Sequence, residues 1–204
     1  MLAIAPKLGL GKSMRAEFKG DDPGLAAAAE SITALAMRDD FWDGIRAHGP
    51  FDFAMIDAAE ITRRLQAEAH TIRVVLWKPR LSRRSFYQNT VAVTNPGELF
   101  VLHYHAAFLG NSVGQKINTI VHEFIHNVDD HDGQPGEQMG HGDNDWRGKE
   151  NSAPYWIGEY AQRLYEAAHP AVAAQPYPAA PVDAEVFEDE ACGNEYTGSP
   201  DPEV

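Results

Sequence analysis

The strongest chemical signal in this chain is in residues 116–133, which read KINTIVHEFIHNVDDHDG. His122 and His126 are four positions apart, so on a helix their imidazoles are neighbours and can reach the same ion. Zinc accepts two such nitrogens and leaves room for a third protein ligand and a water. Glu123 projects from the same surface and can face that water without binding the metal, which suits a general base. The pattern predicts one zinc ion per chain and hydrolytic chemistry at that ion.

The residues around this motif predict an amphipathic helix. Six apolar residues recur at helical spacing and form one stripe: Ile117, Ile120, Val121, Phe124, Ile125 and Val128. At about 100° per residue, His122 and His126 project well away from that stripe. We therefore expect the two histidines to lie outside the apolar core. Residues 129–132 could hold a second ion, but a solvated helix end before Gly133 is the interpretation that we favour.

Two histidines do not complete a zinc site, and the residues alone leave the third ligand open. Asp132 follows His126 by six positions, and Glu159 belongs to a later predicted helix. Asp143 and His141 share a glycine-rich loop that could fold back beneath the first helix. Each of these four side chains offers an oxygen or nitrogen that zinc accepts.

The elements that must position these residues are predicted from helix caps and periodicity. Helices are expected over residues 23–38, 54–69, 112–129 and 154–168. Strands are expected over 71–77, 90–94 and 99–104, with a turn at 95–97 between the last two. The second helix is expected to turn four side chains toward the core: Met55, Ile56, Ala59 and Ile61. Two helices, a small sheet and two further helices indicate an α+β domain.

Composition predicts a single domain followed by a tail. The chain has 204 residues, of which 44% are hydrophobic, enough for one core over residues 1–169. Residues 164–204 contain nine acidic residues and no basic one, and the prolines concentrate there too. We therefore expect residues 170–204 to form an acidic tail, rich in proline and alanine, outside the core. The net charge of −13 argues against a nucleic-acid partner.

The sequence gives no sign of a membrane partner or of a secretory route. No apolar run approaches the ~20 residues that cross a bilayer, and the N-terminus does not resemble a signal peptide. A single cysteine, Cys192, excludes an intramolecular disulfide. We expect a chain made in the cytoplasm, with export by a route that needs no signal peptide as the alternative. An unrestrained endopeptidase would be hazardous there, so narrow specificity, an inhibitor or an immunity protein is also expected.

Residues from about 90 to 165 resemble the aspzincin metallopeptidases, which include the deuterolysins and the peptidyl-lysine metalloendopeptidases. The family's motifs are matched by TIVHEFIH, GHGDNDWRG and NSAPYWIGE. The resemblance implies a zincin-like fold in which His122, His126 and Asp143 bind zinc and Glu123 is the base.

The same resemblance suggests further site residues. Tyr155 matches the tyrosine of the family's last motif, and Asn151 matches its asparagine. Trp146 stands where the family has a tyrosine thought to stabilise the oxyanion, and His141 stands where it has a threonine. The predicted catalytic residues are therefore Glu123 and Tyr155, with the oxyanion role open between Tyr155 and Trp146.

The function expected from these observations is zinc-dependent hydrolysis of peptide bonds in a polypeptide substrate. One alternative keeps the chemistry but takes cell-wall peptides as substrate, as an exported toxin or effector would. Another is a binding module that the metal stabilises and that performs no catalysis.

Overall fold

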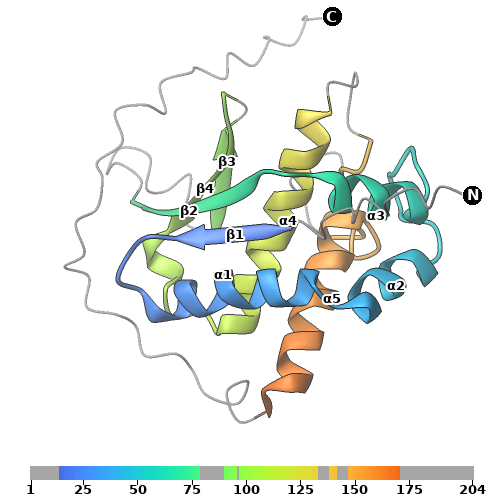
Figure 1. The fold of residues 1–204 in the computed structure, drawn as a ribbon. Helices are drawn as coiled ribbons and strands as arrows, with labels where there is room; N and C mark the ends of the chain where they lie inside the picture. Colours follow the sequence, from blue (N-terminus) through green and yellow to red (C-terminus); the bar gives the residue numbers. More distant parts are fainter. Residues whose placement is uncertain (1–13, 79–89, 96, 133–137, 142–146, 171–204) are drawn as a thin grey trace, which may run out of the picture.

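The computed structural model describes residues 14–78, 90–95, 97–132, 138–141 and 147–170 (Figure 1). These residues form a four-stranded sheet and five α-helices, so the predicted α+β class is confirmed. In chain order the elements are β1 (Arg15–Phe18), α1 (Pro23–Ala36), α2 (Asp39–Ala47), α3 (Ala58–Ala67), β2 (Thr71–Trp77), β3 (Ala92–Asn95), β4 (Glu98–His105), the short 3₁₀ helix η2 (Ala106–Phe108), α4 (Val113–His131) and α5 (Ala153–Ala168).

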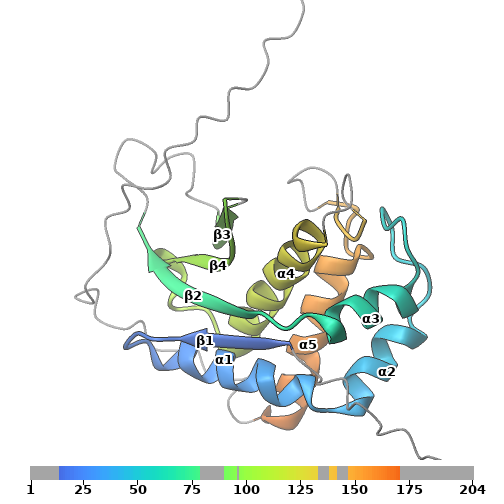
Figure 2. The ribbon, with the colours of Figure 1, turned by 45° about the horizontal axis from the view of Figure 1, so that its top comes forward.

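The sheet has the strand order β1-β2-β4-β3. β1, β2 and β4 run parallel, and β3 pairs antiparallel with β4 at one edge of the described sheet. Helix α1 packs along β1 and against α4, while α4 contacts β3 and β4 and packs along α5 (Figure 2). Helix α4 therefore lies between the β4–β3 side of the sheet and α5.

The predicted apolar stripe of α4 forms the centre of the core. Ile117, Ile120, Val121, Phe124, Ile125 and Val128 are all buried. They share one core cluster with side chains from α1 and from the strands, such as Leu25, Ile32, Ile72 and Leu102. Burial of this stripe holds one face of α4 against the rest of the fold and leaves the face with the two histidines for other contacts.

Helices α1 and α4 begin next to residues whose side chains cap them. The Asp22 carboxylate accepts the N–H of Leu25 at 2.7 Å and caps α1, with Pro23 in the first turn. A capping box begins α4, because the Ser112 hydroxyl accepts the N–H of Gln115 while the Gln115 side chain accepts the N–H of Ser112. These caps explain why the predicted starts of α1 and α4 agree with the structure within one residue.

The predicted start of the second helix is wrong. Helix α3 begins at Ala58, because the Asp57 carboxylate caps it by accepting the N–H of Glu60 at 2.8 Å. Met55 lies before the cap and is exposed, and its N–H donates to the carbonyl of Gln138 at 2.9 Å. Ala59 is exposed as well, whereas Ile61 is buried as expected.

Two elements were not predicted, namely β1 and α2. Helix α2 buries three large side chains, Phe41, Trp42 and Ile45, against the core. Most of the predicted acidic tail, residues 171–204, lies outside the described residues. Over the ranges that the structure describes, no helix combines the length and the apolar character needed to cross a membrane.

Candidate metal centre

Three imidazoles converge beside α4, from His122, His126 and His141. The Nε2 atom of His126 lies 3.2 Å from Nε2 of His122 and 3.0 Å from Nε2 of His141. Zinc–nitrogen bonds of 2.0–2.1 Å place tetrahedral ligands about 3.3 Å apart, which is close to these separations. A neutral imidazole has only one N–H, so His126 Nε2 cannot donate to both neighbours at once. The donor set therefore fits a cation held by three nitrogens better than it fits hydrogen bonds alone.

Burial favours the neutral form of the two histidines on α4. It lowers the pKa of His126 to about 4, with a further contribution from His141. It also lowers the pKa of His122 well below its usual value, and the neighbouring His126 and His141 act in the same direction. At neutral pH both rings are therefore uncharged, which is the form that binds a metal.

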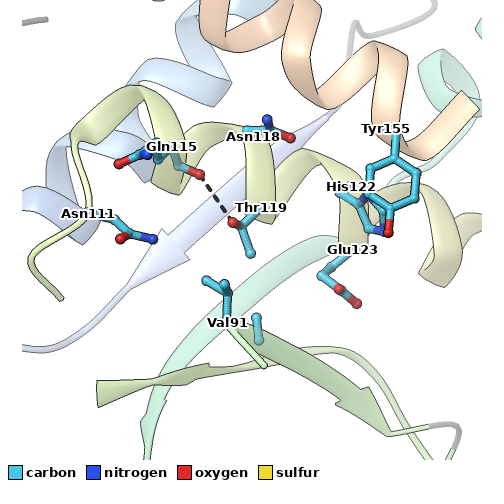
Figure 3. Close-up of a pocket in the computed structure, with 9 residues that line it drawn as sticks. Val91, Asn111, Gln115, Asn118, Thr119, His122, Glu123 and Tyr155 are labelled. Atoms are coloured by element: carbon cyan, nitrogen blue, oxygen red, sulfur yellow. Dashed lines mark hydrogen bonds between the residues drawn. The ribbon is translucent and has the colours of Figure 1, made fainter. Parts of the chain in front are cut away.

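Glu123 lies next to the histidines but is not part of their cluster. It lines a cavity of about 350 Å³ together with Val91, Ala92, Asn111, Gln115, Asn118, Thr119, His122 and Tyr155. Figure 3 shows Glu123, His122 and Tyr155 at one end of this pocket and Asn111 at the other. Burial raises the pKa of Glu123 to about 7, although the Thr94 hydroxyl, which donates to Oε2 at 3.2 Å, opposes the shift.

Tyr155 contacts two of the three histidines from the first turn of α5. Its ring centroid lies 4.5 Å from that of His122 and 5.0 Å from that of His141. The start of α5 is held in turn by Asn151, whose side chain bonds Nε2 of His48 at 2.7 Å and the carbonyl of Pro50 at 3.2 Å. Of the two residues that match the family's last motif, Tyr155 therefore lies at the cluster, whereas the side chain of Asn151 bonds to His48 and Pro50.

The loop that carries His141 is anchored to α4 by Asp129. One carboxylate oxygen of Asp129 accepts the backbone N–H groups of Gln138 and Met139, each at 2.9 Å. Asp129 is buried, and Met139 is fully enclosed in the core. The expectation that residues 129–132 form a solvated helix end is therefore wrong for Asp129. Asp129 lies one turn after His126, and the sequence analysis did not predict that it would bind the loop that carries His141.

The other candidates for the third ligand divide into two groups. Asp143, the predicted ligand, and Trp146 lie outside the described residues. Asp132 instead forms an ion pair with Arg64, and Glu159 is exposed and pairs with Arg163 at 2.9 Å. Among the candidates that the structure describes, His141 is the one that lies with His122 and His126.

The candidate metal centre therefore consists of side chains from α4, from α5 and from the loop between these helices. The arrangement consists of three nitrogen donors with the partly buried Glu123 carboxylate and the Tyr155 ring beside them. Comparisons with protein-family models, with curated proteins and with solved structures found no match to this chain.

Proposed function

We propose that this protein is a zinc-dependent peptidase whose ligands are His122, His126 and His141 and whose general base is Glu123. One observation carries the proposal: three Nε2 atoms converge beside a glutamate that faces the adjoining pocket. Three neutral imidazoles are a donor set that zinc accepts, with a position left for a water or a substrate. This ligand set replaces Asp143 of the aspzincin pattern with His141.

Glu123 is suited to moving a proton near neutral pH. When bound, zinc would polarise a scissile carbonyl and lower the pKa of a water. In the metal-free protein burial raises the pKa of Glu123 to about 7, and a bound cation would lower that pKa, which favours the carboxylate that accepts a proton and later returns it to a leaving amine. The hydroxyl of Thr94, on β3, fixes the direction of the carboxylate.

The walls of the pocket support an extended polypeptide as substrate. Val91, the residue before β3, lies on one side, and Gln115, Asn118 and Thr119 of α4 lie on another (Figure 3). Ala92 of β3 belongs to the lining as well. Because β3 is the last strand of the described sheet, a peptide running beside it could pair with the strand through main-chain hydrogen bonds. The amide and hydroxyl side chains of α4 would then face the peptide from across the pocket.

The proposed scaffold is zincin-like, with a sheet, an active-site helix and a following helix that supplies Tyr155. The relationship to the aspzincins is part of the proposal and rests on the sequence motifs. In this protein it would cover His122, Glu123, His126 and Tyr155, and it would differ at the third ligand.

The test compares zinc-loaded wild type with zinc-loaded Glu123→Gln on a denatured proteome and on purified peptidoglycan. Metal analysis confirms first that both proteins hold the same amount of zinc. New peptide N-termini that appear with wild type alone, identified by mass spectrometry, are the expected result. Soluble cell-wall peptides without new protein termini would move the substrate to peptidoglycan. Identical products from the two proteins, or none from either, would contradict the proposed activity and favour a binding module.

A further inference from the structure

A second group of metal-ligand side chains lies at the far end of α4 from its capping box. Glu68 follows the last residue of α3, His70 lies between α3 and β2, and His131 is the last residue of α4. Each offers a ligand atom, and these three atoms lie within 4.8 Å of one another. None of the three residues belongs to the pocket or to the three-histidine cluster.

The carboxylate of Glu68 is the centre of this group. Its Oε1 lies 2.6 Å from Nδ1 of His70, and its Oε2 lies 2.9 Å from Nδ1 of His131. The Glu68 side chain is only 7% exposed, whereas the two histidine side chains are about half exposed, at 55% and 42%. The site therefore has a buried anion on the inside and solvent-accessible nitrogen donors on the outside.

The histidines are held in place by one aromatic ring. His70 stacks on Phe100 with centroids 4.8 Å apart and planes 16° apart, and His131 meets the same ring edge-on at 5.4 Å. Phe100 has a φ of 60°, a conformation that is strained for a bulky residue. Its N–H donates to the side chain of Asn127 at 2.5 Å, which fixes the ring beside the end of α4. Both imidazoles therefore pack against Phe100, and they also contact each other and Glu68.

The charge of the group favours a cation. The Glu68 carboxylate accepts the backbone N–H of His70 at 2.8 Å and lies against the Nδ1 atoms of both imidazoles. The group therefore places an anionic oxygen ligand beside two nitrogen ligands. A divalent ion bound by all three would balance that negative charge.

We propose that Glu68, His70 and His131 form a second binding site for a divalent transition metal such as zinc. Two imidazole nitrogens and a carboxylate oxygen are donors that zinc accepts, and waters would complete the coordination at the exposed side. Magnesium and calcium favour oxygen ligands, so the two imidazoles select against them. On binding, each neutral ring carries its proton on Nε2, so that the Nδ1 lone pair faces the ion.

The role of this second ion is structural. It would join the α3–β2 connection to the C-terminal turn of α4, the helix that carries His122, His126 and Asp129. The proposal does not depend on the proposed peptidase activity, because the two sites share no ligand.

The test is a zinc titration of the metal-free, full-length protein and of three multiple variants. We expect two equivalents for wild type, one for His122→Ala/His126→Ala, one for His70→Ala/His131→Ala, and none when all four substitutions are combined. The matched control is His169→Ala, an exposed histidine outside both groups, which should retain two equivalents.

The variants separate this proposal from the first one. If His70→Ala/His131→Ala binds as much zinc as wild type, the second site is refuted, whatever the other variants do. If His122→Ala/His126→Ala binds as much as wild type, the three-histidine site is refuted and the second site is untouched. Circular dichroism confirms that each variant is folded, and the comparison of His70→Ala/His131→Ala with wild type remains decisive if His122→Ala/His126→Ala does not fold.

Discussion

The carboxylate of Asp129 accepts the N–H of Met139 at 2.9 Å, two residues before His141. Helix α4 therefore supplies two histidines and, one turn later, the anchor for the loop that brings the third. Since the same carboxylate also accepts the N–H of Gln138, the segment just before His141 is bound to the helix at two consecutive residues.

Asp129→Ala should weaken zinc binding although Asp129 is not one of the three ligands. The substitution leaves two backbone N–H groups of the loop without their acceptor, which costs about 1–3 kcal/mol for each group that stays buried. Loss of an outer contact that orients a ligand lowers metal affinity about 10–100-fold, and we expect a fall in that range. Competition with a chromophoric chelator measures it. The exposed neighbour Asp130→Ala is the control, and equal affinities in the two variants would show that the anchor is not needed.

His141→Ala and Asp143→Ala should differ in the amount of zinc that they retain. We expect His141→Ala to lose most of the zinc held by the three-histidine site and Asp143→Ala to retain it. Metal analysis after dialysis measures both, and Glu159→Ala serves as a control, because Glu159 pairs with Arg163. Loss of zinc from Asp143→Ala with retention in His141→Ala would restore the aspartate ligand that the aspzincin resemblance implies.

In the metal-free protein, Glu123 should make the free energy of unfolding fall as the pH rises. Its pKa is about 7 in the folded protein and near 4.5 in an ordinary setting, so the folded state binds more protons between these values. The contribution of Glu123 to stability is therefore fully present below pH 4.5 and is lost as the pH rises through 7.

Urea unfolding of wild type and Glu123→Gln at pH 5 and pH 8 measures this pH dependence. Because glutamine cannot ionise, the variant should gain stability relative to wild type at the higher pH. A difference between the two proteins that does not change with pH would mean that Glu123 is not shifted.

Tyr155→Phe should separate a catalytic role from a packing role. The ring that contacts His122 and His141 remains, so we expect zinc affinity and unfolding temperature to stay near those of wild type. If the hydroxyl stabilises the oxyanion, kcat should fall about 10²–10³-fold with little change in KM. An unchanged kcat would leave that role to Trp146.

The part of the site that could be predicted from sequence is the part that local geometry determines. His122, Glu123 and His126 belong to one helix, and their relation follows from helical spacing once the apolar stripe shows which face is buried. His141 was one of four candidates, because its position depends on the bonds from Asp129 to the returning loop, and no periodicity encodes those bonds.

The same contrast between local and long-range interactions explains which helices and strands could be predicted from the sequence. Helices α1 and α4 begin at caps that the sequence displays, Asp22 and Ser112. Helix α2 is short, contains Gly44 and has no side-chain cap, so it depends on the packing of Phe41 and Trp42 rather than on propensity. Strand β1 has only four residues and pairs with β2, where Arg15 is opposite Thr71 in a register that no local pattern reveals.

The most direct test of the three-histidine centre is X-ray absorption at the zinc edge. The sample is the His70→Ala/His131→Ala variant loaded with one equivalent of zinc, so that the signal comes from a single site. We predict three imidazole ligands at about 2.0–2.1 Å and one further light atom, falling to two imidazoles after the additional substitution His141→Ala. Two imidazoles and a carboxylate before that substitution, with no change after it, would contradict the account.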